Sequence, residues 1–159
     1  MILRDFQELP SGVSFVFIRR PNPLPGDLRP TWRVALVLLI LFYSRAQKAS
    51  FQKMHVVNWA LHSPITRNLL LGYLEGRVPK DELIPRIEPS LNRAVEFARA
   101  ERLVLVEKGK NLKLQPKGAA TIREIDGTDI FSEEKRFLQK IKPFATEQNI
   151  NLLLDWSTP

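Results

Sequence analysis

Residues 89–123 read PSLNRAVEFARAERLVLVEKGKNLKLQPKGAATIR, and this stretch decides the fold. Pro89 suits the first turn of a helix, because the N-H that it lacks would have no intrahelical partner there. Side chains recur at three- and four-residue spacing along one face, formed by Leu91, Ala94, Val95, Ala98 and Arg102. The stretch therefore predicts a helix that packs through this face. The residues expected to point outward are Asn92, Arg93, Glu96 and Arg99.

The second part of the stretch predicts a hairpin. Residues 103–106 are an apolar run rich in β-branched side chains and too short for a helix of their own, which favours a strand. Lys108 to Asn111 follow, where the glycine and the asparagine are expected to supply the positive backbone angles of a tight turn. Residues 112–115 alternate leucine with polar residues, the period of a strand with one buried face. Pro116 then opens another helix, Lys117 to Ile125. This order of elements is typical of a winged helix.

Three further helices are expected before this stretch. Thr31 can cap a helix from Trp32 to about Gln47 that is apolar around most of its circumference, so it should lie in the middle of the fold. Ser50 can cap a second helix, Phe51 to Leu61. Ser63 and Pro64 start a third, which runs to about Glu75 and ends at Gly76.

The sequence thus predicts a mainly α protein with a small β-hairpin. Residues 1–30 form an arm in which the apolar run Val13 to Ile18 can be a strand. Residues 31–125 form the winged-helix domain, with an insertion at 63–88 and the wing at 103–115. Residues 126–159 form a C-terminal helical extension in which Ser132 starts a helix and Pro143 breaks it.

Composition limits the class of protein. At 159 residues and 44% apolar content the chain can bury a real core, and with no cysteine it fits a reducing cytoplasm. The formal charge is +7, which favours acidic partners such as nucleic acid. The longest apolar run, Val34 to Tyr43, is about half of a membrane span, so no membrane association is expected.

No catalytic chemistry is predicted. His55 and His62 lie seven residues apart on one expected helix, which supplies no carboxylate or thiol to complete a metal site, so polar packing is the favoured interpretation. The sequence contains neither a phosphate-binding glycine loop nor a serine nucleophile elbow. We therefore expect no catalytic residue, no metal and no cofactor, and a protein that is not an enzyme.

DNA is the expected nucleic-acid partner. Residues 91–123 hold eight basic and three acidic residues, and wing lysines can meet phosphates while the preceding helix enters a groove. The alternatives are a solvated surface without a ligand, and a hairpin that docks a protein. The candidate DNA-binding residues are Arg93, Arg99, Arg102, Lys108, Lys110, Lys113 and Lys117.

Apolar side chains outside the expected core indicate protein partners. In the helix 51–61, Val56 and Trp59 lie off the predicted core stripe, and the C-terminus is unusually apolar, so it should dock on its own domain or on another chain. The arm at 1–30 either packs on the domain or orders on a partner. The candidate partner-binding residues are Val56, Trp59, Phe144, Leu152, Leu154 and Trp156.

The stretches TWRVALVLLILFYSRAQKASFQKMHVVNWAL (residues 31–61) and LNRAVEFARAERLVLVEKGKNLKLQPKG (residues 91–118) resemble the middle components of bacterial ABC three-component systems. Those are small winged-helix proteins encoded beside an SMC-like ATPase, often with an effector, in loci linked to defence against phage or plasmids. The chain is similar, more distantly, to winged-helix accessory subunits of bacterial condensins. The resemblance implies a subunit that bridges the ATPase and its effector, and it implies no site residues. The competing hypothesis is a homodimeric transcription regulator that reads an operator through Asn92, Arg93 and Arg99.

Overall fold

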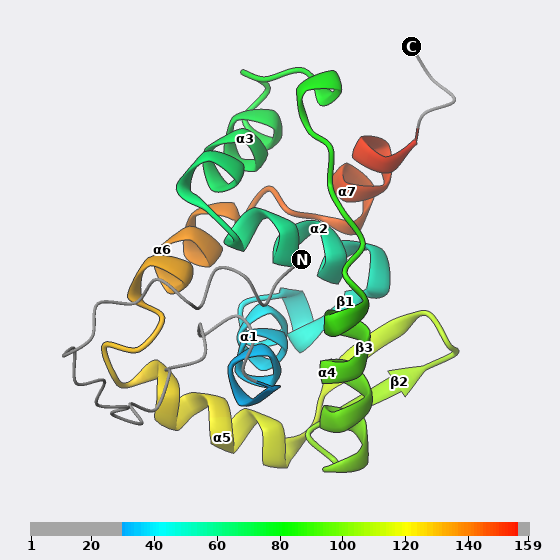
Figure 1. The fold of residues 1–159 in the computed structure, drawn as a ribbon, viewed down its shortest axis with the longest axis vertical. Helices are drawn as coiled ribbons and strands as arrows, with labels where there is room; N and C mark the ends of the chain where they lie inside the picture. Colours follow the sequence, from blue (N-terminus) through cyan, green and yellow to red (C-terminus); the bar gives the residue numbers. More distant parts are fainter. Residues whose placement is uncertain (1–29, 156–159) are drawn as a thin grey trace, which may run out of the picture.

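The structure is a computed structural model that describes residues 30–155, in which helices gather around α1 (Pro30–Phe42) and a small three-stranded antiparallel sheet lies at one side (Figure 1). The prediction of a mainly α protein with a small β element is confirmed. The expected arm and its strand at Val13 to Ile18 lie outside the described residues. The elements in chain order are α1 (Pro30–Phe42), η2 (Arg45–Gln47, a 3-10 helix), β1 (Lys48–Ser50), α2 (Phe51–Leu61), α3 (Pro64–Leu74), η3 (Lys80–Glu82, a 3-10 helix), α4 (Pro89–Ala100), β2 (Val104–Glu107), β3 (Asn111–Leu114), α5 (Pro116–Asp126), α6 (Ser132–Ile141) and α7 (Glu147–Leu154).

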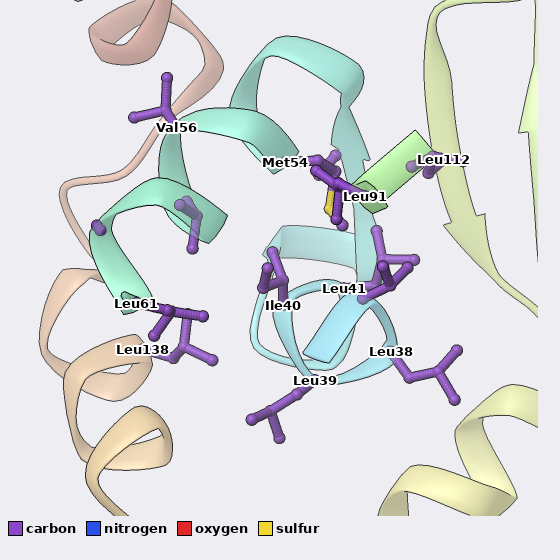
Figure 2. Packing of buried hydrophobic residues seen from close by; sticks show 14 of the residues in the cluster. Leu38, Leu39, Ile40, Leu41, Met54, Val56, Leu61, Leu91, Leu112 and Leu138 are labelled. Atoms are coloured by element: carbon purple, nitrogen blue, oxygen red, sulfur yellow. The ribbon is translucent and has the colours of Figure 1, made fainter. Parts of the chain in front are cut away.

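The helix α1 lies in the middle of the fold, as its apolar sequence predicts. It packs against α2, α4, α5 and β3, so that almost no direction around it is left to solvent. Figure 2 shows Leu38, Leu39, Ile40 and Leu41 pointing to different sides of α1, and each is at most 1% exposed. Burial of such side chains contributes about 1.5–3 kcal/mol each to hydrophobic stabilisation.

The chain leaves α1 earlier than expected. The predicted helix to Gln47 ends at Phe42, and the Ser44 hydroxyl donates a hydrogen bond of 2.7 Å to the carbonyl of Ile40 near this end. Ala46 and Gln47 then adopt positive φ angles of 55° and 53°, which no continuous helix tolerates. This turn directs residues 48–50 into β1, a strand that the sequence analysis did not predict.

The sheet has the order β1-β3-β2 with both pairs antiparallel. Ala49 pairs with Leu112, and Val106 pairs with Leu112 from the other side, so the central strand is β3. Side chains at these positions face the helices, and Leu112 is fully buried. The alternate positions Lys48 and Lys113 are opposite each other and form the outer face.

The helices α2 and α3 begin at the predicted caps. The Ser50 hydroxyl accepts a hydrogen bond of 3.1 Å from the N-H of Lys53, and Ser63 forms a reciprocal capping pair with Thr66. After α3, Gly76 has a φ of 76°, the left-handed conformation in which glycine commonly ends a helix. Residues 75–88 then run along the molecule to α4 (Figure 1).

The C-terminal helices pack on the rest of the domain. As predicted, α6 begins at Ser132, and it ends at Ile141, before Pro143. Helix α6 contacts α3, and α7 contacts α2 through a face that buries Ile150 and Leu153. The apolar C-terminal segment therefore docks on its own domain as far as Leu154. No helix within 30–155 is long and apolar enough to cross a membrane.

Candidate nucleic-acid interface

The helix α4 presents one packed and one exposed face, as its periodicity predicts. Leu91, Ala94, Val95 and Ala98 are at most 5% exposed, and α4 packs against α1 through them. The opposite face is exposed and carries, in chain order, Asn92, Arg93, Glu96, Phe97 and Arg99.

The end of α4 is fixed by backbone hydrogen bonds. The N-H of Leu103 donates to the carbonyl of Ala98 at 2.8 Å, and the N-H of Arg102 donates to that of Arg99 at 3.0 Å. This arrangement requires a left-handed residue, and Arg102 takes that position with a φ of 58°. The chain thereby reverses into β2. The prediction that Arg102 belongs to the packed face of the helix is wrong, because α4 ends at Ala100 and Arg102 is exposed.

The hairpin tip, Lys108 to Lys110, is fully solvent-facing and tightly turned. Lys108 and Gly109 have φ angles of 52° and 64°, and the N-H of Lys110 donates to the carbonyl of Glu107 at 3.1 Å. The prediction that Asn111 supplies a positive φ is wrong, because Asn111 belongs to β3 and pairs with Glu107. The carbonyl of Lys110 accepts from the N-H of Phe51 at 3.1 Å, so the tip is attached to the start of α2.

Three of the seven predicted cations already have acidic partners. Lys113 lies 4.0 Å from Glu107, and Arg99 lies 3.9 Å from Glu96. Lys117 donates to the backbone carbonyl of Glu101 at 3.0 Å and lies 3.7 Å from its carboxylate, which joins the start of α5 to the end of α4. The four cations that form no ion pair with a residue in 30–155 are Arg93, Arg102, Lys108 and Lys110.

Glu107 is the acidic centre of the hairpin base. A hydrogen bond from Lys48, together with the charges of Lys113 and Lys108, holds the pKa of the Glu107 carboxyl below its usual value. Two of these lysines, Lys48 and Lys113, lie on the outer face of the sheet and share the one carboxylate of Glu107. Among the predicted DNA-binding residues, the cations that form no ion pair with a described residue are therefore at the hairpin tip, on α4 and at the end of α4.

A second group of cations surrounds a pocket that the sequence analysis missed. The pocket has a volume of about 840 Å³ and lies between the turn after α1 and the segment joining α6 to α7. The positive charge of part of this pocket could have been predicted, because the sequence has no acidic residue between Asp27 and Glu75. The charged residues that line it are Arg45, Lys48, Lys53, Lys142 and Glu147.

His55 is partly buried and His62 is exposed, and both lie near Glu88. Glu88 accepts hydrogen bonds from Arg33 at 3.1 Å and from Asn58 at 3.3 Å, and the Nε2 atom of His62 lies 2.5 Å from its other oxygen. Burial lowers the pKa of His55 below its ordinary value of 6.5, against the opposing effects of Asn92 and Glu88. The described part of the chain holds no group of three or more histidine, aspartate or glutamate side chains that could bind a metal.

The predicted partner-binding residues divide into two groups. Val56 and Trp59 are only 1% and 8% exposed, so the expectation that they lie outside the core is wrong. The helix α2 is covered by α1 on one side and by α3 and α7 elsewhere, and Figure 2 shows Val56 on the side of α2 away from α1.

The C-terminal members of that set lie nearer the surface. Phe144 and Leu152 are exposed, Leu154 is partly buried against the core, and Trp156 lies outside the described residues. The sequence analysis also missed exposed apolar side chains before α4, on α4 and on β2, namely Ile84, Ile87, Phe97 and Leu105.

Comparisons with protein-family models, with curated proteins and with solved structures each found no match to this chain.

Proposed function

We propose that the chain is a winged-helix module that contacts duplex DNA through α4 and the hairpin tip. The connectivity carries this proposal: helix, strand and helix (α1, β1, α2) are followed by a helix and a hairpin (α4, β2, β3), and β1 completes the sheet beside β3. In this assignment α4 is the recognition helix and the β2–β3 hairpin is the wing. Helix α3 is an insertion, and α5 to α7 are the extension.

The free cations support contact with phosphates. Lys108 and Lys110 are exposed at the tip of the hairpin. In Figure 1 the β2–β3 hairpin follows α4 and extends to the edge of the molecule. Arg93 is exposed on α4 without an ion pair to any described residue. Lysine and arginine side chains in such positions gain affinity by releasing counterions from the phosphate backbone.

The composition of the α4 face favours contact without base recognition. Glu96 lies among Arg93 and Arg99, and Phe97 is 53% exposed on the same helix. A carboxylate facing a phosphate-lined groove opposes close insertion, and it leaves few donors for base edges. We therefore propose sequence-independent binding.

The resemblance described above extends the proposal to a larger assembly. We propose that the module is a non-enzymatic accessory subunit that joins an SMC-like ATPase and its effector in defence against phage or plasmids. Exposed apolar side chains, among them Ile84, Ile87 and Leu152, offer surface for such partners. The regulator hypothesis requires dimerisation through the C-terminal helix, and α7 already packs on α2, which makes that alternative the weaker one.

Fluorescence anisotropy of labelled duplexes at several salt concentrations tests DNA contact. The wing variant combines Lys108→Asn, which suits the positive φ, with Lys110→Gln. The matched control combines Arg136→Gln with Lys140→Gln, two exposed cations on α6, which lies away from the hairpin (Figure 1). We expect the wing variant to bind all duplexes more weakly and to lower the salt slope by about one unit per lost phosphate contact.

Two results would contradict the proposal. One is a wild-type affinity that hardly responds to salt, and the other is an equal loss in the wing variant and in the control. The proposed assembly is tested separately, by purifying the tagged chain together with the product of the neighbouring gene. If the chain is a monomer and no ATPase co-purifies with it, the proposed assembly is refuted, whereas the proposed DNA contact is not.

A further inference from the structure

The pocket of about 840 Å³ beside β1 takes no part in the function proposed above. Four cations line it, Arg45, Lys48, Lys53 and Lys142, against the single carboxylate of Glu147. Lys48 is paired with Glu107 across the sheet, whereas Arg45, Lys53 and Lys142 form no ion pair within the described range. Three cations thus converge on one pocket, in which Glu147 is the single acidic neighbour.

Lys53 is the least ordinary member of this group. It lies in the first turn of α2, only 7% exposed, and its Nζ atom makes no hydrogen bond to any residue from 30 to 155. The nearby Glu147 carboxylate is already engaged, because the N-H and the hydroxyl of Ser50 donate to its two oxygens at 3.0 and 2.6 Å. Burial lowers the pKa of the Lys53 ammonium, against the opposing charge of Glu147, and its Nζ atom remains accessible from the pocket.

The rest of the lining indicates the kind of ligand. Arg45 and Lys142 are exposed and stand on two segments that are far apart in sequence but border the same pocket. No aromatic side chain is among the lining residues, so a base or ring would find no stacking surface. Guanidinium and ammonium groups around a buried lysine suit an anion with several oxygens.

We propose that this pocket binds a phosphate group, with Lys53 as the buried contact and Arg45 and Lys142 as the exposed ones. Phosphate supplies enough acceptor oxygens for all three side chains, and its charge offsets the net positive charge of the lining. The phosphate belongs either to a nucleic-acid backbone or to a free oligophosphate. The proposal does not depend on the wing cations, because neither Lys108 nor Lys110 lines the pocket, although Asn111 of β3 does.

Calorimetric titration with inorganic pyrophosphate tests the site. We expect wild-type binding, weakened about tenfold or more by Lys53→Met or by Lys142→Gln and unchanged by the control Arg136→Gln. Lys53→Met keeps the apolar stem and removes a buried charge, and Lys142 is exposed, so both variants should fold. No binding by wild type up to about 10 mM pyrophosphate, or equal binding by all the variants, would overturn the proposal.

A second arm assigns the source of the phosphate. If Lys142→Gln also weakens duplex binding and pyrophosphate competes with DNA, the site holds a nucleic-acid phosphate. If the Lys142→Gln variant no longer binds pyrophosphate but binds DNA as tightly as wild type, the ligand is a free oligophosphate. The wing variant should bind pyrophosphate as tightly as wild type does. The experiment can therefore refute the phosphate site without refuting DNA binding by the wing, and the reverse.

Discussion

Replacing Gly118 by alanine should destabilise the whole domain, because the third residue of α5 lies directly against the start of the hairpin. A Cβ atom at Gly118 would stand 2.2 Å from the carbonyl oxygen of Leu103 and 2.9 Å from a methyl carbon of Leu114. The same carbonyl accepts the hydrogen bond from the N-H of Gln115 at 2.9 Å. The helix or the carbonyl must therefore move by roughly 0.8 Å to reach even a 3.0 Å separation, and this hydrogen bond is stretched or lost.

The magnitude follows from three contributions. Overpacking in a close-packed interior costs about 1–3 kcal/mol. A buried carbonyl or N-H without its partner costs about 1–3 kcal/mol more. Alanine regains about 1 kcal/mol over glycine within a helix. The expected net loss is about 1–5 kcal/mol in the free energy of unfolding.

Urea denaturation followed by circular dichroism measures this loss. The matched control is Gly127→Ala, since the nearest atoms to its Cβ are 3.7 and 3.8 Å away and its φ of −74° suits any residue. We expect Gly127→Ala to lie within about 0.5 kcal/mol of wild type or slightly above it. A Gly118→Ala variant as stable as the control would refute the packing of α5 against the hairpin.

Other changes test single features of the fold. Arg102→Gly should raise the free energy of unfolding by about 0.5–1 kcal/mol, because glycine adopts the φ of 58° without strain; a lower urea midpoint would contradict this. Glu88→Gln should lower it by about 1–3 kcal/mol, since Arg33 and His62 lose their carboxylate, and thermal melting checks the loss. The pKa of folded His55 lies below 6.5, so the unfolded chain binds more protons and stability should fall as the pH drops below about 6.5. His55→Gln should flatten that dependence in urea midpoints measured from about pH 7.5 to 5.5, and an unchanged slope would count against it.

Elements with local signals could be predicted from the sequence. The periodicity of α4, the apolar run of β2 and the alternation of β3 are patterns of neighbouring residues. Proline or glycine lies at or near the ends of these elements. The strand β1 could not be predicted, because residues 48–50 become a strand only by pairing with β3, about sixty residues later. The apolar run before them also concealed the end of α1 at Phe42.

The burial of α2 and the cationic pocket lined by Arg45 and Lys142 depend on tertiary packing. Val56 and Trp59 were predicted to lie outside the core because they are off the single core stripe of the helix 51–61, whereas α1, α3 and α7 together cover several sides of α2. Arg45 and Lys142 are 97 positions apart and meet only because the segment before α7 returns to the start of α2. The cations of α4 and of the hairpin tip were predicted because they lie within one continuous stretch.

The most direct test of the DNA contact is residue-by-residue mapping of the full chain by amide chemical shifts during titration with a short duplex. We expect the largest shifts at Lys108 to Lys110 and along residues 92–99, with the same pattern for duplexes of unrelated sequence. Little change is expected on α6. Shifts confined to the surroundings of Lys142, or a spectrum that does not change with DNA, would contradict the account of α4 and the wing.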